Sequence, residues 1–243
     1  MKVIICDLDG TLCESREHIS VRIGKLISKL AKKYLFVIIT GGNWDRYPEQ
    51  VFDRLDDCAI HCFSSMGNEY KVFKKKNNKM YLKSMYENTL NDVQKFGIKF
   101  AMNCLKDHFP KLTTEAFKFE DKGGSVTFSG TGKNAPKFIK QDFDPLCSVR
   151  KEWVSKLREE KLLPFDVCVK IGGTTSLDFM LKDSGKRQAV EYFLSRKKIK
   201  PENTLYIGDA IFEDGNDEDI IGCVPYKKVK TVNQTYKILR DLL

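Results

Sequence analysis

The first apolar run of the chain is short and ends at an acidic residue. Residues 3–6 read Val-Ile-Ile-Cys, and Asp7 follows them directly. A short apolar run that stops at a polar loop is typical of a strand buried on both faces of a parallel sheet. The pattern therefore predicts a strand at residues 3–6, with Asp7 at its carboxyl end.

Apolar residues next recur at helical spacing between residues 19 and 33. The residues that would share one face of this helix are Ile19, Ile23, Leu26, Ile27 and Leu30. A second apolar run at residues 35–39 predicts another strand, which ends at Thr40, and residues 48–55 are expected to form a further helix. Because strands and helices alternate, the pattern indicates the beginning of a doubly wound sheet.

The middle of the chain has a different pattern. Residues 81–105 have the period of an amphipathic helix. Two short alternating runs, at residues 116–120 and 125–128, flank a Lys-Gly-Gly turn and predict a β-hairpin. A further helix and two strands are predicted, in this order, at residues 153–160, 166–171 and 175–181. We expect these elements to form an antiparallel sheet with helices packed on it.

The alternation of strands and helices returns at Lys186, where a helix is predicted to about residue 198. The next strand, at residues 204–207, ends at Gly208 and Asp209. In both segments of the chain where strands and helices alternate, the predicted strands therefore end next to polar residues of the kinds that catalysis uses.

These patterns together predict an α/β fold. Its core would be a doubly wound, parallel-sheet (Rossmann-like) structure formed by residues 1–80 and 185–243. Residues 81–184 would form an inserted α+β cap domain.

The charge of the chain is strongly positive. The 42 Lys and Arg residues exceed the 33 Asp and Glu residues, which gives a formal net charge of +9. The basic runs are scattered among acidic residues, and no aromatic-interleaved nucleic-acid motif accompanies them. A solvated basic face, or steering of anionic substrates, is therefore favoured over a nucleic-acid partner.

Two further features bear on the location of the protein. No stretch approaches the roughly 18 uninterrupted apolar residues of a membrane-spanning helix, so we predict no membrane partner. The eight cysteines are dispersed, and Cys58, His61 and Cys62 lack the second ligand pair of a zinc site. Reduced thiols in a cytoplasmic protein are the expected state.

The residues that follow the first strand, from Asp7 to Thr11, carry the strongest chemical signal. Phosphoryl transfer needs a nucleophile, a cation that neutralises the phosphate oxygens, and a group that exchanges a proton with the leaving oxygen. Two carboxylates two residues apart can share this work: Asp7 attacks phosphorus and Asp9 moves the proton. Gly10 would permit a tight turn beside the phosphate. The alternative is an ordinary turn after a strand.

Three further elements agree with this interpretation in order and spacing. Thr40 would offer a hydroxyl group to a phosphate oxygen, and Lys186 would pair with the nucleophile and the phosphate. Asp209 and Asp217 would bring oxygen ligands that suit Mg²⁺. Each residue alone has an ordinary explanation, as a strand-end threonine, a surface lysine or a solvated acidic loop.

These four elements resemble the four motifs of haloacid dehalogenase superfamily phosphotransferases. Over nearly the whole chain the sequence more narrowly resembles the eukaryotic-type phosphomannomutase family. Arg16 matches a substrate-contacting arginine in the family's first loop, and Ser176 and Asp178 match a cap strand that binds sugar or phosphate. The resemblance implies a Mg²⁺ site. Its residues would be Asp7, the backbone carbonyl of Asp9, Asp209 and, in support, Asp217.

The cap departs from the family at three positions. By spacing, Lys122, Lys133 and Lys140 stand where the mutases hold the distal phosphate with arginines. Lysine keeps the charge but loses the planar, bidentate geometry of arginine. The three lysines would therefore retain an anion site, or they belong to a cap that has changed toward another phosphate ester.

The resemblance implies that the enzyme interconverts hexose (mannose) 6-phosphate and 1-phosphate through an aspartyl-phosphate and a hexose bisphosphate. Its partners would be the sugar phosphate and a bisphosphate activator, and a homodimer through the cap is an expectation from the family alone. The main alternative is a Mg²⁺-dependent sugar-phosphate phosphatase, because water would resolve the same aspartyl-phosphate. A catalytically silent binding protein is a third possibility, since fold does not imply function.

Overall fold

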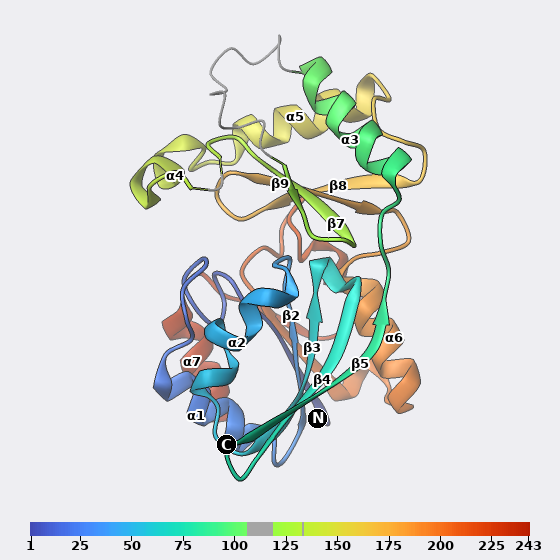
Figure 1. Ribbon diagram of the computed structural model, residues 1–243. Coiled ribbons are helices and arrows are strands. Elements are labelled where there is room, and N and C mark those ends of the chain that lie inside the picture. Colours follow the sequence, from blue (N-terminus) through green and yellow to red (C-terminus); the bar gives the residue numbers. More distant parts are fainter. Residues whose placement is uncertain (106–118, 133) are drawn as a thin grey trace. The chain divides into compact units, whose positions relative to one another are not determined.

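The computed structural model describes residues 1–105, 119–132 and 134–243. The chain forms two compact units. The first comprises residues 1–87, 184–213 and 217–243, and the second comprises residues 88–183 with residues 214–216. The two units are drawn in Figure 1.

The first unit is built on a seven-stranded sheet of order β11-β10-β1-β2-β3-β4-β5, counted in the part of the chain that the structure describes. Its strands are β1 (Val3–Asp7), β2 (Leu35–Ile39), β3 (Cys58–Ser64), β4 (Glu69–Lys76), β5 (Lys79–Glu87), β10 (Thr204–Gly208) and β11 (Tyr226–Lys228). The strands from β11 to β3 are parallel, whereas β4 and β5 are antiparallel additions at one edge. The predicted parallel-sheet α/β fold is therefore confirmed.

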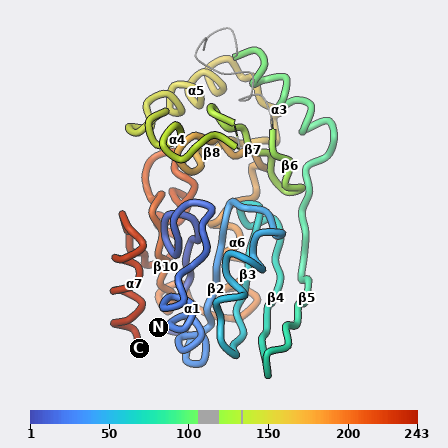
Figure 2. The backbone as a smooth tube through the Cα atoms, turned by 60° about the vertical axis from the view of Figure 1, so that its left-hand side comes forward, coloured from blue at the N-terminus to red at the C-terminus, as the bar shows by residue number. Residues whose placement is uncertain are grey.

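Helices cover both faces of this sheet (Figures 1 and 2). They are α1 (Val21–Leu30), α2 (Tyr47–Gln50), α6 (Lys186–Lys197) and α7 (Val232–Asp241). Ile4 and Cys6 of β1 belong to the apolar core on one face, and Val3 and Ile5 belong to the core on the other face. The uninterrupted apolar run of β1 thus reflects a strand that is buried on both sides.

Helix α1 follows the predicted apolar period and contains a glycine for a steric reason. The side chain of Ser20 caps the helix by accepting a hydrogen bond of 3.3 Å from the backbone N–H of Ile23. A Cβ atom at Gly24 would lie 2.1 Å from the carbonyl oxygen of Arg54. The helix therefore lies so close to the backbone near Arg54 that only glycine fits.

The predicted helix at residues 81–105 is wrong in its first part. Residues Lys79–Glu87 form strand β5, and the helix, α3, occupies Asp92–Leu105. Asn77 and Asn78 have φ values of 52° and 60°, which asparagine tolerates and a two-residue hairpin turn requires. The expected boundary between residues 80 and 81 thus falls inside a strand of the first unit's sheet.

The helix predicted at residues 48–55 is also broken. Helix α2 ends at Gln50, Val51 has a φ of −126°, and a separate 3₁₀ turn occupies Phe52–Arg54. Trp44, Tyr47 and Phe52 pack together there, with ring centroids 4.9–5.8 Å apart. The backbone here therefore follows the packing of these aromatic side chains and not the helical period of the sequence.

The second unit has a four-stranded sheet of order β6-β7-β9-β8, counted in its described residues. Its elements are α3, β6 (Glu120–Asp121), β7 (Ser125–Ser129), α4 (Lys137–Phe143), α5 (Ser148–Glu159), β8 (Val167–Gly172) and β9 (Ser176–Leu181). The hairpin of β6 and β7 confirms the predicted turn, in which Gly123 has a φ of 73°. Residues 116–118 of the predicted first run lie outside the described residues.

Alternating residues of this second sheet separate an apolar face from a polar face. Val126 and Phe128 of β7 lie in the apolar core with Trp153 of α5. Thr127 of β7 and Asp178 of β9 are register partners on the opposite face. A buried, polar sheet face is therefore present in this unit.

Two properties of the described residues concern the whole chain. No helix in them combines the length and the apolarity needed to cross a membrane. They include all eight cysteines, and no disulfide joins any pair of these.

Candidate active site

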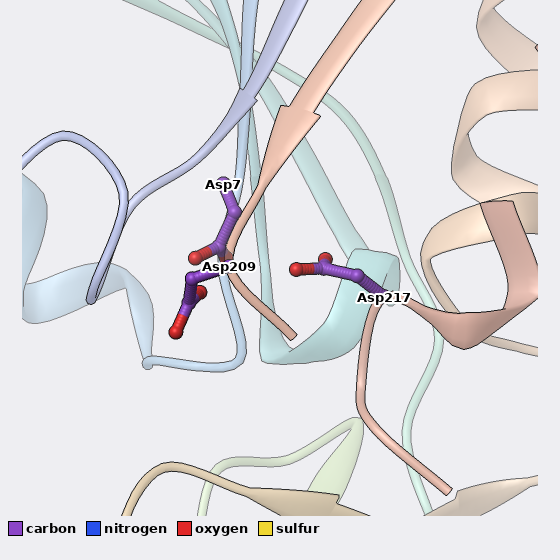
Figure 3. A group of neighbouring side chains, drawn as sticks. All are labelled: Asp7, Asp209 and Asp217. Atoms are coloured by element: carbon purple, nitrogen blue, oxygen red, sulfur yellow. The ribbon is translucent and has the colours of Figure 1, made fainter. Parts of the chain in front are cut away.

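The carboxyl ends of two adjacent strands bring Asp7 and Asp209 together. β1 pairs in parallel with β10, and these strands end at Asp7 and Gly208, directly before Asp209. Asp217 follows in the loop after β10. One carboxylate oxygen from each of the three aspartates lies within 4.8 Å of the others (Figure 3).

Lys186 is the positive charge of this cluster. It is the first residue of α6, and none of its surface is exposed. Its Nζ donates to Oδ1 of Asp7 at 2.5 Å and to Oδ1 of Asp217 at 2.7 Å. The lysine thus links the nucleophile expected from the sequence to the loop after β10.

Asp217 is fixed by two further donors. The hydroxyl group of Tyr206 donates to Oδ1 of Asp217 at 2.5 Å, and the backbone N–H of Ala210 donates to Oδ2 at 3.1 Å. Sequence reasoning missed Tyr206, because an aromatic residue inside an apolar strand has the pattern of an ordinary core residue.

Burial and mutual repulsion act on the carboxylates of the cluster. Burial raises the pKa of Asp7 well above its usual value; the ammonium group of Lys186 opposes this shift, and the charges of Asp217 and Asp209 add to it. Burial and the charge of Asp217 raise the pKa of Asp209 to about 6. Burial alone would lower the pKa of Lys186, but Asp217 and Asp7 raise it, so the lysine stays charged.

The three carboxylates fit a divalent cation. Mg²⁺ prefers hard oxygen ligands, and buried carboxylates that repel one another are stabilised by a cation placed between them. Among the described residues, the aspartates of Figure 3 are the group whose oxygens converge in this way. Asp7 and Asp209 with Asp217 are therefore the residues that would hold the metal in the first unit.

The loop after β1 turns tightly beside Asp209. Gly10 has a φ of 86°, and a Cβ atom there would lie 2.4 Å from Oδ2 of Asp209. The hydroxyl group of Thr11 donates to Oδ1 of Asp209 at 3.3 Å. Glycine is thus required at residue 10 both for its backbone conformation and for space.

Asp9 points to a different set of donors from Asp7. Its Oδ1 accepts a hydrogen bond of 2.5 Å from the backbone N–H of Arg16 and one of 3.4 Å from Nε2 of Gln50. Arg16 adopts a φ of 66°, a left-handed conformation that is uncommon outside glycine. Gln50 also donates to the carbonyl oxygen of Glu17 at 3.1 Å, so it joins two parts of the loop.

Thr40 lies at the carboxyl end of β2 and is 2% exposed. Its Oγ1 accepts a hydrogen bond of 3.0 Å from the backbone N–H of Gly42. Its carbonyl oxygen accepts one from the N–H of Met66, also at 3.0 Å. The hydroxyl group is therefore oriented by the backbone of its own loop.

Comparison with known proteins identifies the family. The family model described as haloacid dehalogenase-like hydrolase matches residues 4–221, which include all four elements of the site. The chain belongs to the haloacid dehalogenase-like hydrolase family. The resemblance noted in the sequence is thereby confirmed.

Curated relatives of this family member include phosphomannomutases from several eukaryotes. The phosphomannomutase of Arabidopsis thaliana is 24% identical over 96% of this chain and 90% of its own length. That of Encephalitozoon cuniculi is 25% identical over 90% of this chain and 83% of its own. The similarity therefore includes both compact units.

Solved structures of similar fold come from phosphatases and nucleotidases. The IMP-bound IMP-nucleotidase of Plasmodium falciparum has a TM-score of 0.73 at 16% identity and covers 100% of this chain and 68% of that one. The sucrose-phosphatase of Synechocystis has a TM-score of 0.54 at 14% identity, over 94% and 82% of the two chains. At these identities the likeness concerns the fold alone.

The second unit contains Lys122, Lys140, Ser176 and Asp178 of the substrate residues expected for this family member, and two of these are in contact. Asp178 of β9 accepts hydrogen bonds at Oδ1 from the hydroxyl group of Thr127 and, at 3.5 Å, from Nζ of Lys122. A Cβ atom at Gly172 would lie 2.1 Å from Oδ2 of Asp178, so glycine leaves room for this carboxylate. Lys122 is thus an ion-pair partner of Asp178, which sequence reasoning did not foresee.

The remaining predicted cap residues are spread over this unit. Ser176 begins β9 and is half-buried, and Lys140 lies on α4. Lys133 lies outside the described residues. Of the predicted cap residues, the structure therefore brings Lys122 and Asp178 together.

A buried arginine holds the turn between β8 and β9. Arg150 of α5 donates to Oδ2 of Asp144 at 2.8 Å and to the carbonyl oxygens of Gly172 and Gly173 at 3.2 and 2.5 Å. Burial alone would raise the pKa of Asp144, but the hydrogen bonds from Arg150 and the backbone hold it below its usual value. This ion pair fixes the turn that precedes Ser176.

Proposed function

We propose that the chain is a phosphomannomutase-like phosphotransferase that interconverts hexose (mannose) 6-phosphate and 1-phosphate. The observation that carries this proposal is the similarity to phosphomannomutases, which extends over 96% of the chain and includes both units. The cluster around Asp7 supports it, because a buried, charged lysine and converging carboxylates are what phosphoryl transfer requires.

In the proposed reaction an oxygen of Asp7 forms a bond to phosphorus while the bond from phosphorus to the leaving oxygen breaks. Lys186 donates to Oδ1 of Asp7, which orients the carboxylate before the attack. Asp9 gives a proton to the leaving oxygen and later takes it back from the hydroxyl group that attacks the aspartyl-phosphate. The N–H of Arg16 and the amide of Gln50 hold Asp9 for this step.

The hydroxyl group of Thr40 and the ammonium group of Lys186 would receive the phosphate oxygens. Both side chains are almost completely buried, so their interactions with an anion would be little weakened by water. When bound at Asp7, Asp209 and Asp217, with the backbone carbonyl of Asp9, Mg²⁺ supplies charge neutralisation of the transferred group.

A mutase must also bind the second phosphate of the bisphosphate intermediate. We propose that the cap does this with Lys122, Lys133 and Lys140, while Ser176 and Asp178 bind the sugar. Arg16 of the first unit is proposed separately as a substrate-contacting residue, as the family resemblance implies. The ion pair between Lys122 and Asp178 supports a shared site for anion and hydroxyl groups. The partners would be the sugar phosphate and a hexose bisphosphate activator.

A sugar-phosphate phosphatase is the second candidate. The family description of a hydrolase and the fold shared with the sucrose-phosphatase favour it. Lysine at the three cap positions also favours it, because a lysine holds a phosphate less directionally than an arginine does. The core chemistry is common to both candidates up to the aspartyl-phosphate.

One phosphorus NMR experiment distinguishes the two candidates. The purified protein is incubated with mannose 1-phosphate, Mg²⁺ and a trace of glucose 1,6-bisphosphate. The proposal predicts mannose 6-phosphate without a matching release of free phosphate, and dependence of the rate on the bisphosphate. Free phosphate as the main product would replace the mutase with the phosphatase.

We also propose a cytoplasmic homodimer that associates through the cap. Helix α3 supports the dimer, because Val93, Phe96 and Phe100 lie on one face and are 79%, 71% and 57% exposed. Cysteines held as thiols agree with a cytoplasmic location. Replacement of Phe96 by Glu should then convert a dimer to a monomer in sedimentation equilibrium.

A further inference from the structure

Tyr206 is a buried residue of β10 whose hydroxyl group faces the charged cluster. Its side chain is fully buried, and its backbone pairs with Ile5 of β1, two residues before Asp7. The hydroxyl group donates to Oδ1 of Asp217 at 2.5 Å. A tyrosine in an otherwise apolar strand thus places one polar atom in the site.

The oxygen that Tyr206 contacts is the one that also binds Lys186. Oδ1 of Asp217 accepts from Tyr206 at 2.5 Å and from Lys186 at 2.7 Å, and Oδ2 accepts from the N–H of Ala210 at 3.1 Å. With these three donors the carboxylate is fixed in position and in orientation. Lys186 reaches Asp7 from this fixed anchor, at 2.5 Å.

Gly208 shows that the close approach of Tyr206 and Asp217 is built into the strand. A Cβ atom at Gly208 would lie 2.5 Å from Oδ2 of Asp217 and 2.9 Å from Cε1 of Tyr206. Its φ is not in the left-handed range, so glycine is needed there for space alone. The contact between Tyr206 and Asp217 therefore depends on Gly208 of β10 as well as on Tyr206.

We propose that Tyr206 is a positioning residue for phosphoryl transfer, acting through Asp217 and Lys186 on Asp7. This inference rests on the proposed function. When an oxygen of Asp7 bonds to phosphorus and the sugar oxygen leaves with a proton from Asp9, the carboxylate of Asp7 becomes an acyl phosphate. Tyr206 keeps Asp217 from drawing Lys186 away at that moment, so the lysine stays where both Asp7 and the phosphate need it.

The test is Tyr206→Phe, which removes the hydroxyl group and keeps the ring. Because hydrogen bonds to charged groups are among the stronger ones in proteins, we expect kcat to fall about tenfold or more, with KM for the sugar phosphate nearly unchanged. A second readout needs no turnover: the rise in Tm on adding beryllofluoride and Mg²⁺. Beryllofluoride mimics a phosphoryl group on an aspartate, and we expect a smaller rise in the variant than in the wild type.

The matched control is Tyr47→Phe in the same unit. Tyr47 is equally buried, and its hydroxyl group donates to the carbonyl oxygens of Ile38 and Phe63 at 3.2 and 2.9 Å. Its loss should lower Tm but leave kcat and the beryllofluoride response as in the wild type.

Three outcomes decide the matter. A Tyr206→Phe enzyme with wild-type kcat and beryllofluoride response would overturn the positioning role, as would an equal loss of kcat in both variants, which indicates a merely structural effect. A wild-type protein with neither turnover of any phosphate ester nor a beryllofluoride response would overturn the proposed function itself.

Discussion

Some residues of the first unit fit so closely against their neighbours that one added atom would displace a side chain of the site. Gly10 is the clearest case, because it combines a φ of 86° with a contact to Asp209 that leaves no room for a Cβ atom. Gly222 has a similar φ of 76°, but a Cβ atom there would meet nothing within 4 Å. Substitutions at these two glycines can therefore be compared to separate the effect of backbone strain from the effect of displacing Asp209.

We therefore expect Gly10→Ala and Gly222→Ala to have different effects on catalysis. Both should lose roughly 1–2 kcal/mol of stability, because alanine is strained in the left-handed region. Only Gly10→Ala should lower kcat, by about 100-fold, since it pushes the Asp209 carboxylate out of place. Steady-state kinetics and denaturant unfolding of both variants measure this. Equal kcat values would show that the contact with Asp209 is irrelevant to the reaction.

His61 gives a second prediction at the scale of one residue. It is 9% exposed, packs against Phe193 with ring centroids 4.8 Å apart, and shares a hydrogen bond of 2.8 Å between Nδ1 and the Tyr70 hydroxyl group. Burial, with a smaller effect of Lys197, lowers its pKa to about 4. The unfolded chain then binds a proton near pH 6.5 that the folded chain does not bind until about pH 4.

The sign of the effect follows from this difference. Stability contributed by neutral His61 is complete above pH 6.5 and is lost as the pH falls toward 4, by up to about 3 kcal/mol. Chemical unfolding of the wild type and of His61→Gln between pH 7.5 and pH 4 measures it. We expect the wild type to lose more stability than the variant over this range. Parallel curves for the two proteins would contradict the assignment.

At the scale of elements, helix α5 carries two arginine ion pairs that differ in burial. The side chains of Arg150 and Asp144 are 4% and 1% exposed, whereas Arg158, which pairs with Asp214 at 2.8 Å, is 56% exposed. Loss of a partner from a buried pair leaves an uncompensated charge, whereas an exposed pair contributes little.

Arg150→Ala should therefore destabilise the protein far more than Arg158→Ala. We expect losses of roughly 3–5 kcal/mol for the buried arginine and at most about 1 kcal/mol for the exposed one. Urea unfolding, followed by the fluorescence of Trp153 in the same helix, reports on the second unit. Similar losses in the two variants would show that burial does not determine the strength of these pairs.

The sequence predicted helices and strands correctly where one hydrophobic period dominated a segment, and it failed where the strand period was missing. The apolar runs of β1, β2 and β10 are too short for helices, so their type was predicted correctly and their ends to within one residue. Residues 79–87 failed because Met80, Tyr81 and Leu82 are consecutive and exposed on an edge strand, so no alternation marked the strand. The Asn77-Asn78 turn was the available signal.

At the scale of the whole molecule, much of the candidate site was predictable because three of its members lie at the ends of strands of one sheet. Asp7, Thr40 and Asp209 each follow an apolar run, and parallel strands bring their carboxyl ends to one edge. Tyr206 and Arg150 were not predictable in this way. Tyr206 lies in a strand with the pattern of a core, and Arg150 lies before the helix predicted at residues 153–160. Only packing brings their polar atoms to Asp217 and Asp144.

The central claim is that Asp7 accepts the phosphoryl group. Its most direct test is mass spectrometry of protein quenched in acid during turnover of mannose 1-phosphate with Mg²⁺, followed by digestion. We expect the mass of one phosphoryl group on the peptide that contains Asp7, lost on treatment with hydroxylamine and absent from Asp7→Asn. A phosphoryl group on another residue, or turnover by Asp7→Asn at the wild-type rate, would contradict the account.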